Sequence, residues 1–209
     1  TIIQTFKDLH ITEIHYNPVG TPDRDGDDFE FLELKNVGSN ELDLSGVSVS
    51  DGVSFRFPNG SRLAAGAFAV LVRNPEAFAS RYPGRRIAGI YSGRLSNSGE
   101  RLALVHAVGT EIFSVTYDTR PPWPQAADGG GFSLVPAAVA GTVDFNQPGS
   151  WRSSTATGGS PGAEDPTAGI VAVVVKSDIE RMQNNKAGSG MEGIEIDRYG
   201  RENFICHSE

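Results

Sequence analysis

The chain has 209 residues, of which 38% are hydrophobic and 9% aromatic, so it can bury a core and is not a disordered chain. Its 18 basic and 26 acidic residues give a net charge of −8, which disfavours nucleic-acid binding through the overall field. No apolar run reaches membrane-spanning length, so we expect no membrane insertion, and a single cysteine excludes a disulfide within the chain.

Short extended segments fill the first part of the chain. Residues 11–16 form the first, which Asn17-Pro18 ends because proline lacks the N–H donor that a sheet requires. Residues 29–35 form a second strand, and we expect it to be central because apolar side chains fall on both of its faces. The nearly continuous apolar run 67–72 predicts another strand that is buried on both sides.

Turn residues separate the next elements. Asp51-Gly52 predicts a hairpin turn that leads into an alternating strand through Phe55 and Phe57. One short helix is expected from Pro75 to Tyr82, because proline fits the first turn of a helix and Pro83-Gly84 ends it. Further strands are predicted at residues 101–106, 112–117 and 131–135.

This spacing of short strands, without strand–helix alternation, predicts one all-β domain over residues 8–165, either a sandwich or a barrel. The predicted core comprises Ile14, Leu32, Leu34, Leu44, Val47, Phe57, Phe68, Val70, Leu102, Leu104 and Tyr117.

Residues 166–209 are predicted to be a linker and a short C-terminal appendage. The composition falls to Ser, Thr, Gly, Pro and Ala between residues 153 and 169, as is typical of a loop or linker. A strand at 170–175, a helix at 177–186 and a hairpin at 194–206 follow. About forty residues are few for an independent fold, so we expect that the appendage packs on the main domain or a partner, begins a truncated domain, or is partly disordered.

The densest acidic segment holds Asp23, Asp25, Asp27 and Asp28. Alternate carboxylates around Gly26 suit a hard cation, and Asp23, Asp25 and Asp27 are the candidate calcium ligands. The spacing departs from an EF-hand loop, in which the glycine stands at the sixth position. The alternative is a solvated acidic turn between two strands, as loop composition favours.

A basic cluster follows the predicted helix. It comprises Arg81, Arg85, Arg86, Arg94 and Arg101, with Tyr82 and Tyr91 among them. If Arg85, Arg86 and Arg94 converge in space, they would hold phosphate, sulfate, an acidic glycan or nucleic acid. The alternative is a solvated basic rim, because charge runs usually face water.

The sequence predicts no enzyme. It lacks a Gly-x-Ser-x-Gly motif and a phosphate-binding glycine loop. Glu13 and His15 share one face of the first strand, but without a third ligand we interpret them as ordinary polar positions. The enzymatic alternative is a metal-dependent phosphoesterase or nuclease that uses Asp25, Asp28, Glu30 and His15.

Several segments occur in an order that carries a family resemblance: Ile11-Thr-Glu-Ile-His-Tyr-Asn-Pro18, 28–36, 42–47 with Ser50-Asp51-Gly52, 92–102, Pro122-Trp123-Pro124, 127–131 with Ser133-Leu134, Trp151, and Gly159-Ser-Pro-Gly-Ala163. Together they resemble lamin-tail domains of the bacterial type over residues 8–165. The resemblance implies an immunoglobulin-like β-sandwich.

The resemblance also implies a function. Bacterial relatives are modules of secreted or surface-attached multidomain proteins, beside nucleases, phosphoesterases or kinases, and are not themselves enzymes. We therefore expect a noncatalytic interaction or anchoring module of an exported bacterial protein, outside the cell or on its surface, that binds a protein or a cell-envelope component. It needs no cofactor, apart from calcium in the alternative of a calcium-stabilised domain. Nuclear lamins use the corresponding domain to bind proteins and DNA, which supplies the nucleic-acid alternative.

Overall fold

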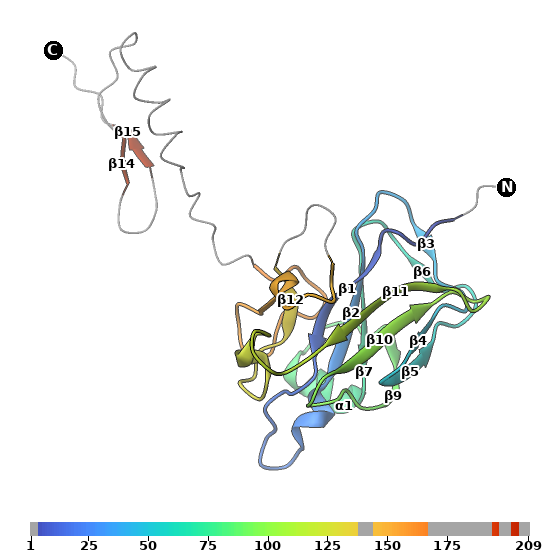
Figure 1. Ribbon diagram of the computed structural model, residues 1–209, viewed down its shortest axis with the longest axis horizontal. Coiled ribbons are helices and arrows are strands. Elements are labelled where there is room, and N and C mark those ends of the chain that lie inside the picture. Colours follow the sequence, from blue (N-terminus) through green and yellow to red (C-terminus); the bar gives the residue numbers. More distant parts are fainter. Residues whose placement is uncertain (1–3, 138–143, 167–193, 197–201, 205–209) are drawn as a thin grey trace, which may run out of the picture. The chain divides into compact units, whose positions relative to one another are not determined.

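Most of the strands form two facing sheets in the computed structural model, which describes residues 4–137, 144–166, 194–196 and 202–204 (Figure 1). The chain divides into two compact units, Thr1–Asp165 and Pro166–Glu209. No helix of the described residues is long and apolar enough to cross a membrane.

The first sheet has six strands in the order β13-β12-β1-β2-β7-β8. Only the β7–β8 pair is parallel. The second strand of the sequence analysis is central, with β1 and β7 on either side, as predicted. The strands are β1 (Leu9–His15), β2 (Phe31–Asn36), β7 (Phe68–Val72), β8 (Gly89–Ile90), β12 (Leu134–Pro136) and β13 (Trp151–Ser153).

The second sheet has five strands in the order β11-β10-β4-β5-β9. Asp51 and Gly52 both have positive φ angles, of 57° and 67°, and connect β4 to β5 in the predicted hairpin. The strands are β4 (Ser48–Ser50), β5 (Val53–Arg56), β9 (Ser92–Gly93), β10 (Glu100–Val105) and β11 (Glu111–Tyr117), and a small ribbon pairs β3 (Leu42–Asp43) with β6 (Arg62–Leu63).

The main core fills the space between the two sheets. Its members include Ile14, Leu34 and Leu71 from the first sheet and Leu102 and Leu104 from the second. The predicted core residues are buried, with one exception. Phe68 is only half-buried, because it lies on the outer face of β7 under the ammonium group of Lys35.

A single helix of the described residues, α1 (Pro75–Arg81), covers part of the outer face of the first sheet. Asn74 caps it by accepting hydrogen bonds from the N–H groups of Glu76 and Ala77, at 3.1 and 3.2 Å. Phe78 packs on Phe31 in a second apolar cluster that also contains Val70 and Val72. The central strands are therefore buried on both faces, which explains their nearly continuous apolar character.

Other boundaries differ from the sequence prediction. Strand β2 begins at Phe31, because Gly26–Phe29 form a 3-10 turn (η1). Strand β12 begins at Leu134, and the predicted strand positions 131–133 are irregular chain. Strand β13 was not predicted. Two further 3-10 turns, η2 (Gln125–Ala127) and η3 (Pro148–Ser150), lie in the connections.

In the second unit, β14 (Ile194–Ile196) and β15 (Glu202–Phe204) pair antiparallel with Ile194 opposite Phe204, as the sequence predicts. The strand predicted at 170–175 and the helix at 177–186 lie outside the described residues.

Candidate functional site

Two buried carboxyl groups face each other on the outer side of the six-stranded sheet. Glu13 on β1 and Glu33 on β2 are register partners, and each is 1% exposed. The register shifts between Ile11 and Glu13, and the hydroxyl of the extra residue, Thr12, donates to Glu33 Oε1 at 2.8 Å. The acidic pair thus lies between the sheet and the closing loop, which we define as residues 154–165 at the end of the first unit.

Glu13 holds that closing loop. It accepts hydrogen bonds from the Ser133 hydroxyl, from the Ser160 N–H at 3.0 Å and from the Ser160 hydroxyl at 3.1 Å. Burial raises the pKa of Glu13 from 4.5 to about 7, although these hydrogen bonds favour the charged form. The backbone of Gly159 covers the carboxyl so closely that a β-carbon there would overlap Oε1.

Glu33 holds the next turn of the same loop. Its Oε2 accepts a hydrogen bond from the Gly162 N–H at 2.6 Å. Burial, and then the negative charge of Glu13, raise the pKa of Glu33 from 4.5 to about 8. Both carboxyls therefore bind the closing loop through hydrogen bonds and are shielded from solvent.

A third buried carboxyl, Glu30, fastens a different segment. Its Oε2 accepts from the Leu95 N–H at 2.9 Å and the Tyr91 hydroxyl at 3.2 Å, and its Oε1 has no partner among the described residues. Burial raises the pKa of Glu30 from 4.5 to about 8. This carboxyl ties the chain between η1 and β2 to the segment that contains β9.

His15 lies on the same face of β1 as Glu13 and is completely buried. Its ring packs edge-on against Phe31, with centroids 5.2 Å apart, and neither ring nitrogen has a well-formed hydrogen bond within the described residues. Burial, and then the positive charge of Arg81, lower the pKa of His15 from 6.5 to about 3. The ring is therefore neutral at physiological pH.

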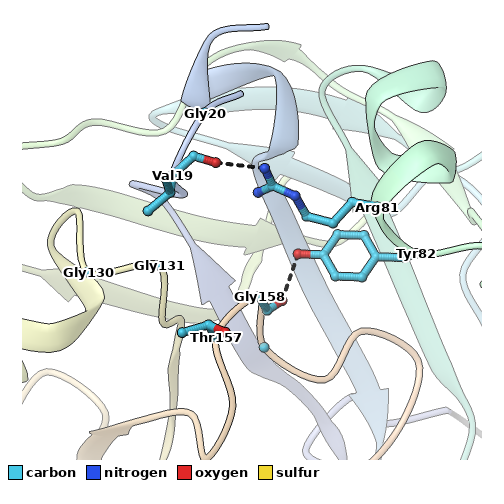
Figure 2. Close-up of a pocket in the computed structure, with 9 residues that line it drawn as sticks. Val19, Gly20, Arg81, Tyr82, Gly130, Gly131, Thr157 and Gly158 are labelled. Carbon is cyan, nitrogen blue, oxygen red and sulfur yellow. Dashed lines mark hydrogen bonds between the residues drawn. The ribbon is translucent and has the colours of Figure 1, made fainter. Parts of the chain in front are cut away.

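A surface hollow of about 460 Å³ opens beside these buried groups. Figure 2 shows Arg81 and Tyr82, at the end of α1, facing the glycine-rich turns of two other loops across this space. The residues that line it are Val19, Gly20, Arg81, Tyr82, Gly130, Gly131, Thr157, Gly158 and Gly159.

Two hydrogen bonds connect the walls of the hollow. Arg81 donates from Nη2 to the Val19 carbonyl at 2.6 Å, and the Tyr82 hydroxyl donates to the Gly158 carbonyl at 2.7 Å (Figure 2). The Arg81 guanidinium also lies over the Phe29 ring, 3.4 Å from its centroid. Hydrogen bonds between segments far apart in the sequence therefore fix the positions of the walls of the hollow.

Comparison with known proteins identifies the family. The model of the lamin tail domain matches residues 4–119. The chain belongs to the lamin tail domain family. No curated protein matches this chain. Lamin tail domains are immunoglobulin-like, in agreement with the two-sheet sandwich.

Two of the predicted calcium ligands of this lamin tail domain have other contacts in the structure, and calcium binding stays a prediction. Asp25 accepts a hydrogen bond from the Asp27 N–H and caps the 3-10 turn, while the Asp27 carboxylate pairs with Arg73 and Arg94 at 3.6 and 3.4 Å. Asp23 makes no ion pair within 4.0 Å in the described part of the chain. No group of three or more His, Cys, Asp or Glu side chains that could hold a metal ion occurs among the described residues.

The predicted anion-binding arginines fall in two places. Arg94 pairs with Asp27, whereas Arg85 and Arg86 are exposed and have no acidic partner in the described ranges. Anion binding by these three residues stays a prediction. The sequence placed Arg81 in the same basic cluster but did not distinguish it from the other arginines, because its position depends on loops around residues 130 and 158 that approach it only after folding.

Sequence reasoning also missed the burial of Glu13, Glu30 and Glu33. One signal was available, since Glu30 and Glu33 interrupt a strand with apolar residues on both faces. The residues of the phosphoesterase alternative are divided between layers: Glu30 and His15 are buried in the unit, whereas Asp25 and Asp28 lie at the 3-10 turn.

Proposed function

We propose that this lamin tail domain is a noncatalytic interaction or anchoring module of an exported multidomain bacterial protein. One observation carries the proposal: Glu13, Glu33 and Glu30 are buried, and each holds a loop in place. Carboxyls that are enclosed in this way stabilise the fold and are not accessible to a substrate in solution. A binding surface, in contrast, needs no convergent set of acids, bases or nucleophiles.

The family supports the location and the kind of partner. The resemblance to bacterial lamin tail domains favours a position outside the cell or at its surface, with a protein or cell-envelope component as partner. The loops at the end of the sandwich that carry Val19, Gly130 and Thr157 are the natural contact surface, because a rigid sheet scaffold presents them to solvent.

The enzymatic alternative is tested by turnover. The purified chain and an Asp28→Asn variant would be incubated with phosphodiester and phosphomonoester substrates in magnesium, manganese or calcium. We expect no turnover above buffer for either protein. Metal-dependent cleavage by the wild type that Asp28→Asn abolishes would overturn the proposal.

Binding is tested with immobilised protein and envelope extracts of the source bacterium. A component should be retained that excess free chain releases in a saturable manner. Melting curves would verify that the immobilised protein remains folded. Retention of nothing that the free chain competes for would contradict the interaction role.

A further inference from the structure

Arg81 is the charged residue that lines the hollow, and it is half-buried without a counter-charge among the described residues. Eight other basic side chains of the described residues form ion pairs with carboxylates. Arg81 has instead a carbonyl oxygen and the face of Phe29 as neighbours, and neither neutralises its charge. A partly desolvated guanidinium in this setting favours an incoming anion.

Other donors line the same space without partners. The backbone N–H groups of Gly130 and Gly131, and the hydroxyl of the exposed Thr157, donate to no acceptor within the described residues. Gly131 has a φ of +83°, a conformation that turns successive peptide groups and in other loops creates a concave anion site. A guanidinium, peptide N–H groups and a hydroxyl together form a donor set suited to an oxyanion.

A second observation comes from the layer next to the hollow. The fully buried His15 lies close enough to Arg81 for the arginine charge to lower its pKa, and within the described residues its ring nitrogens make no well-formed hydrogen bond, only a weak contact with the Gly131 backbone beside the hollow. Buried polar groups of this kind are rare, and water or a ligand often completes their hydrogen bonds. The neutral ring adds no competing positive charge.

The charge balance favours a singly charged carboxylate over a phosphate dianion. The hollow contains one guanidinium, and the chain carries a net charge of −8. A further negative charge, the Asp128 carboxylate, accepts a hydrogen bond from Asn17 next to Gly129. Guanidinium groups bind planar carboxylates through two parallel hydrogen bonds.

The volume and the lining of the hollow suit the end of a peptide. A volume of about 460 Å³ lies in the lower part of the range for small-ligand sites. Val19, which is 54% exposed, and the ring of Tyr82 offer apolar surface for a terminal side chain. Capture of a C-terminal carboxylate by backbone N–H groups is a recurring mode of peptide recognition.

We propose that this hollow binds the C-terminal carboxylate of an extended segment of a partner protein, and that Arg81 is the residue that holds it. The inference rests on the proposed function and names the partner chemistry of the interaction module. Arg85, which is exposed and does not line the hollow, has no part in it.

The test uses tetrapeptides that end in Ala, Val, Leu or Phe, each prepared with a free carboxylate and as the C-terminal amide. Titrations of the full chain would be followed by amide chemical shifts in NMR spectra. We expect saturable shifts at Gly130, Gly131 and Thr157 with free-acid peptides and none with the amides. If amides bind as well as acids, or if no free-acid peptide binds, the proposal is overturned.

Variants assign the role of Arg81. Arg81→Gln should weaken binding of the free-acid peptide roughly tenfold or more, the range of a charge-assisted hydrogen bond. Arg56→Gln, at an exposed position of β5 outside the hollow, is the matched control and should change affinity less than about twofold, within the error of such comparisons. Thr157→Val should also weaken binding of the free-acid peptide. Because Thr157 is exposed, this variant keeps the proposal testable even if Arg81→Gln impairs folding. Unchanged affinity in both Arg81→Gln and Thr157→Val would refute the assignment.

Small anions distinguish a carboxylate ligand from a phosphate ligand. Acetate should cause weak shifts at the same amides, and inorganic phosphate should bind no more tightly than acetate. Tighter binding of phosphate would overturn the carboxylate assignment. If Arg81→Gln still captures the competable envelope component as well as the wild type, the proposed function stands and this inference fails.

Discussion

The acidic pair makes the stability of the domain dependent on pH, and Glu33→Gln should remove much of that dependence. The folded state raises the pKa of Glu33 from 4.5 to about 8, so it retains a proton that the unfolded chain releases. Its contribution to stability is complete below pH 4.5, falls as the pH rises, and is lost above about pH 8. Each pH unit within this window changes the free energy of unfolding by about 1.4 kcal/mol, so the full change is on the order of several kcal/mol.

Glutamine fits the position without the charge. Its carbonyl oxygen would accept from the Gly162 N–H in place of Oε2, and its amide group would donate to the Thr12 hydroxyl in place of Oε1. We therefore expect the variant to match the wild type within about 1 kcal/mol at pH 5. At pH 9 it should be the more stable protein, with a melting temperature higher by on the order of 10 °C.

Urea unfolding at pH 5, 7 and 9 measures the effect. The buried Trp123 and Trp151 supply a fluorescence signal, and Glu41→Gln, at an exposed position, is the control. Glu13 and Glu30 leave a residual slope in the variant, since burial raises the pKa of each. A wild type whose stability is constant from pH 5 to 9, or a Glu33→Gln variant that loses as much stability as the wild type, would refute the reasoning.

Further predictions concern packing, a buried amide and calcium. Gly159→Ala should destabilise the domain by on the order of 3 kcal/mol, because φ is +73° and the new β-carbon overlaps Glu13. The control Gly66→Ala, with a φ of +72° but open space around it, should lose only about 1 kcal/mol of stability. Equal losses of stability in urea unfolding would disprove the packing argument. Asn36→Ala should lose roughly 2–4 kcal/mol, because the buried amide bonds three backbone groups, and a loss below about 1 kcal/mol by the same method would contradict this. The melting temperature should be equal in millimolar calcium and in chelator, because arginines neutralise Asp27; a rise with calcium would restore the calcium hypothesis.

Local signals account for what the sequence predicted well. The Asp51-Gly52 turn, the proline at the start of α1 and the apolar runs of β2 and β7 depend on residues close together in the chain. Their conformations are set by backbone sterics and by side-chain alternation, which a sequence displays directly. These elements appear where they were predicted, within one or two residues.

Long-range contacts account for what the sequence did not display. The segment around Gly159-Ser-Pro-Gly was recognised only as part of a family resemblance. In the structure it supplies the N–H groups of Ser160 and Gly162 to carboxyls 147 and 129 residues earlier in the chain. No local pattern indicates which acid such a loop will meet. Arg81 became a candidate ligand-binding residue for the same reason, since Val19 and Gly158 approach it only after folding.

These contacts also show why the sandwich does not close at residue 119, where the match to the family model ends. Strand β12 pairs with β1, and β13 completes that edge of the sheet. Without the segment that follows, Glu13 would lose the Ser133 and Ser160 donors, and Glu33 would lose Gly162. Two buried carboxyls would then meet water or remain unsatisfied, and one wall of the Arg81 hollow would be missing. Residues 120–165 therefore belong to the same compact unit as the matched strands, and any binding by the hollow depends on both parts.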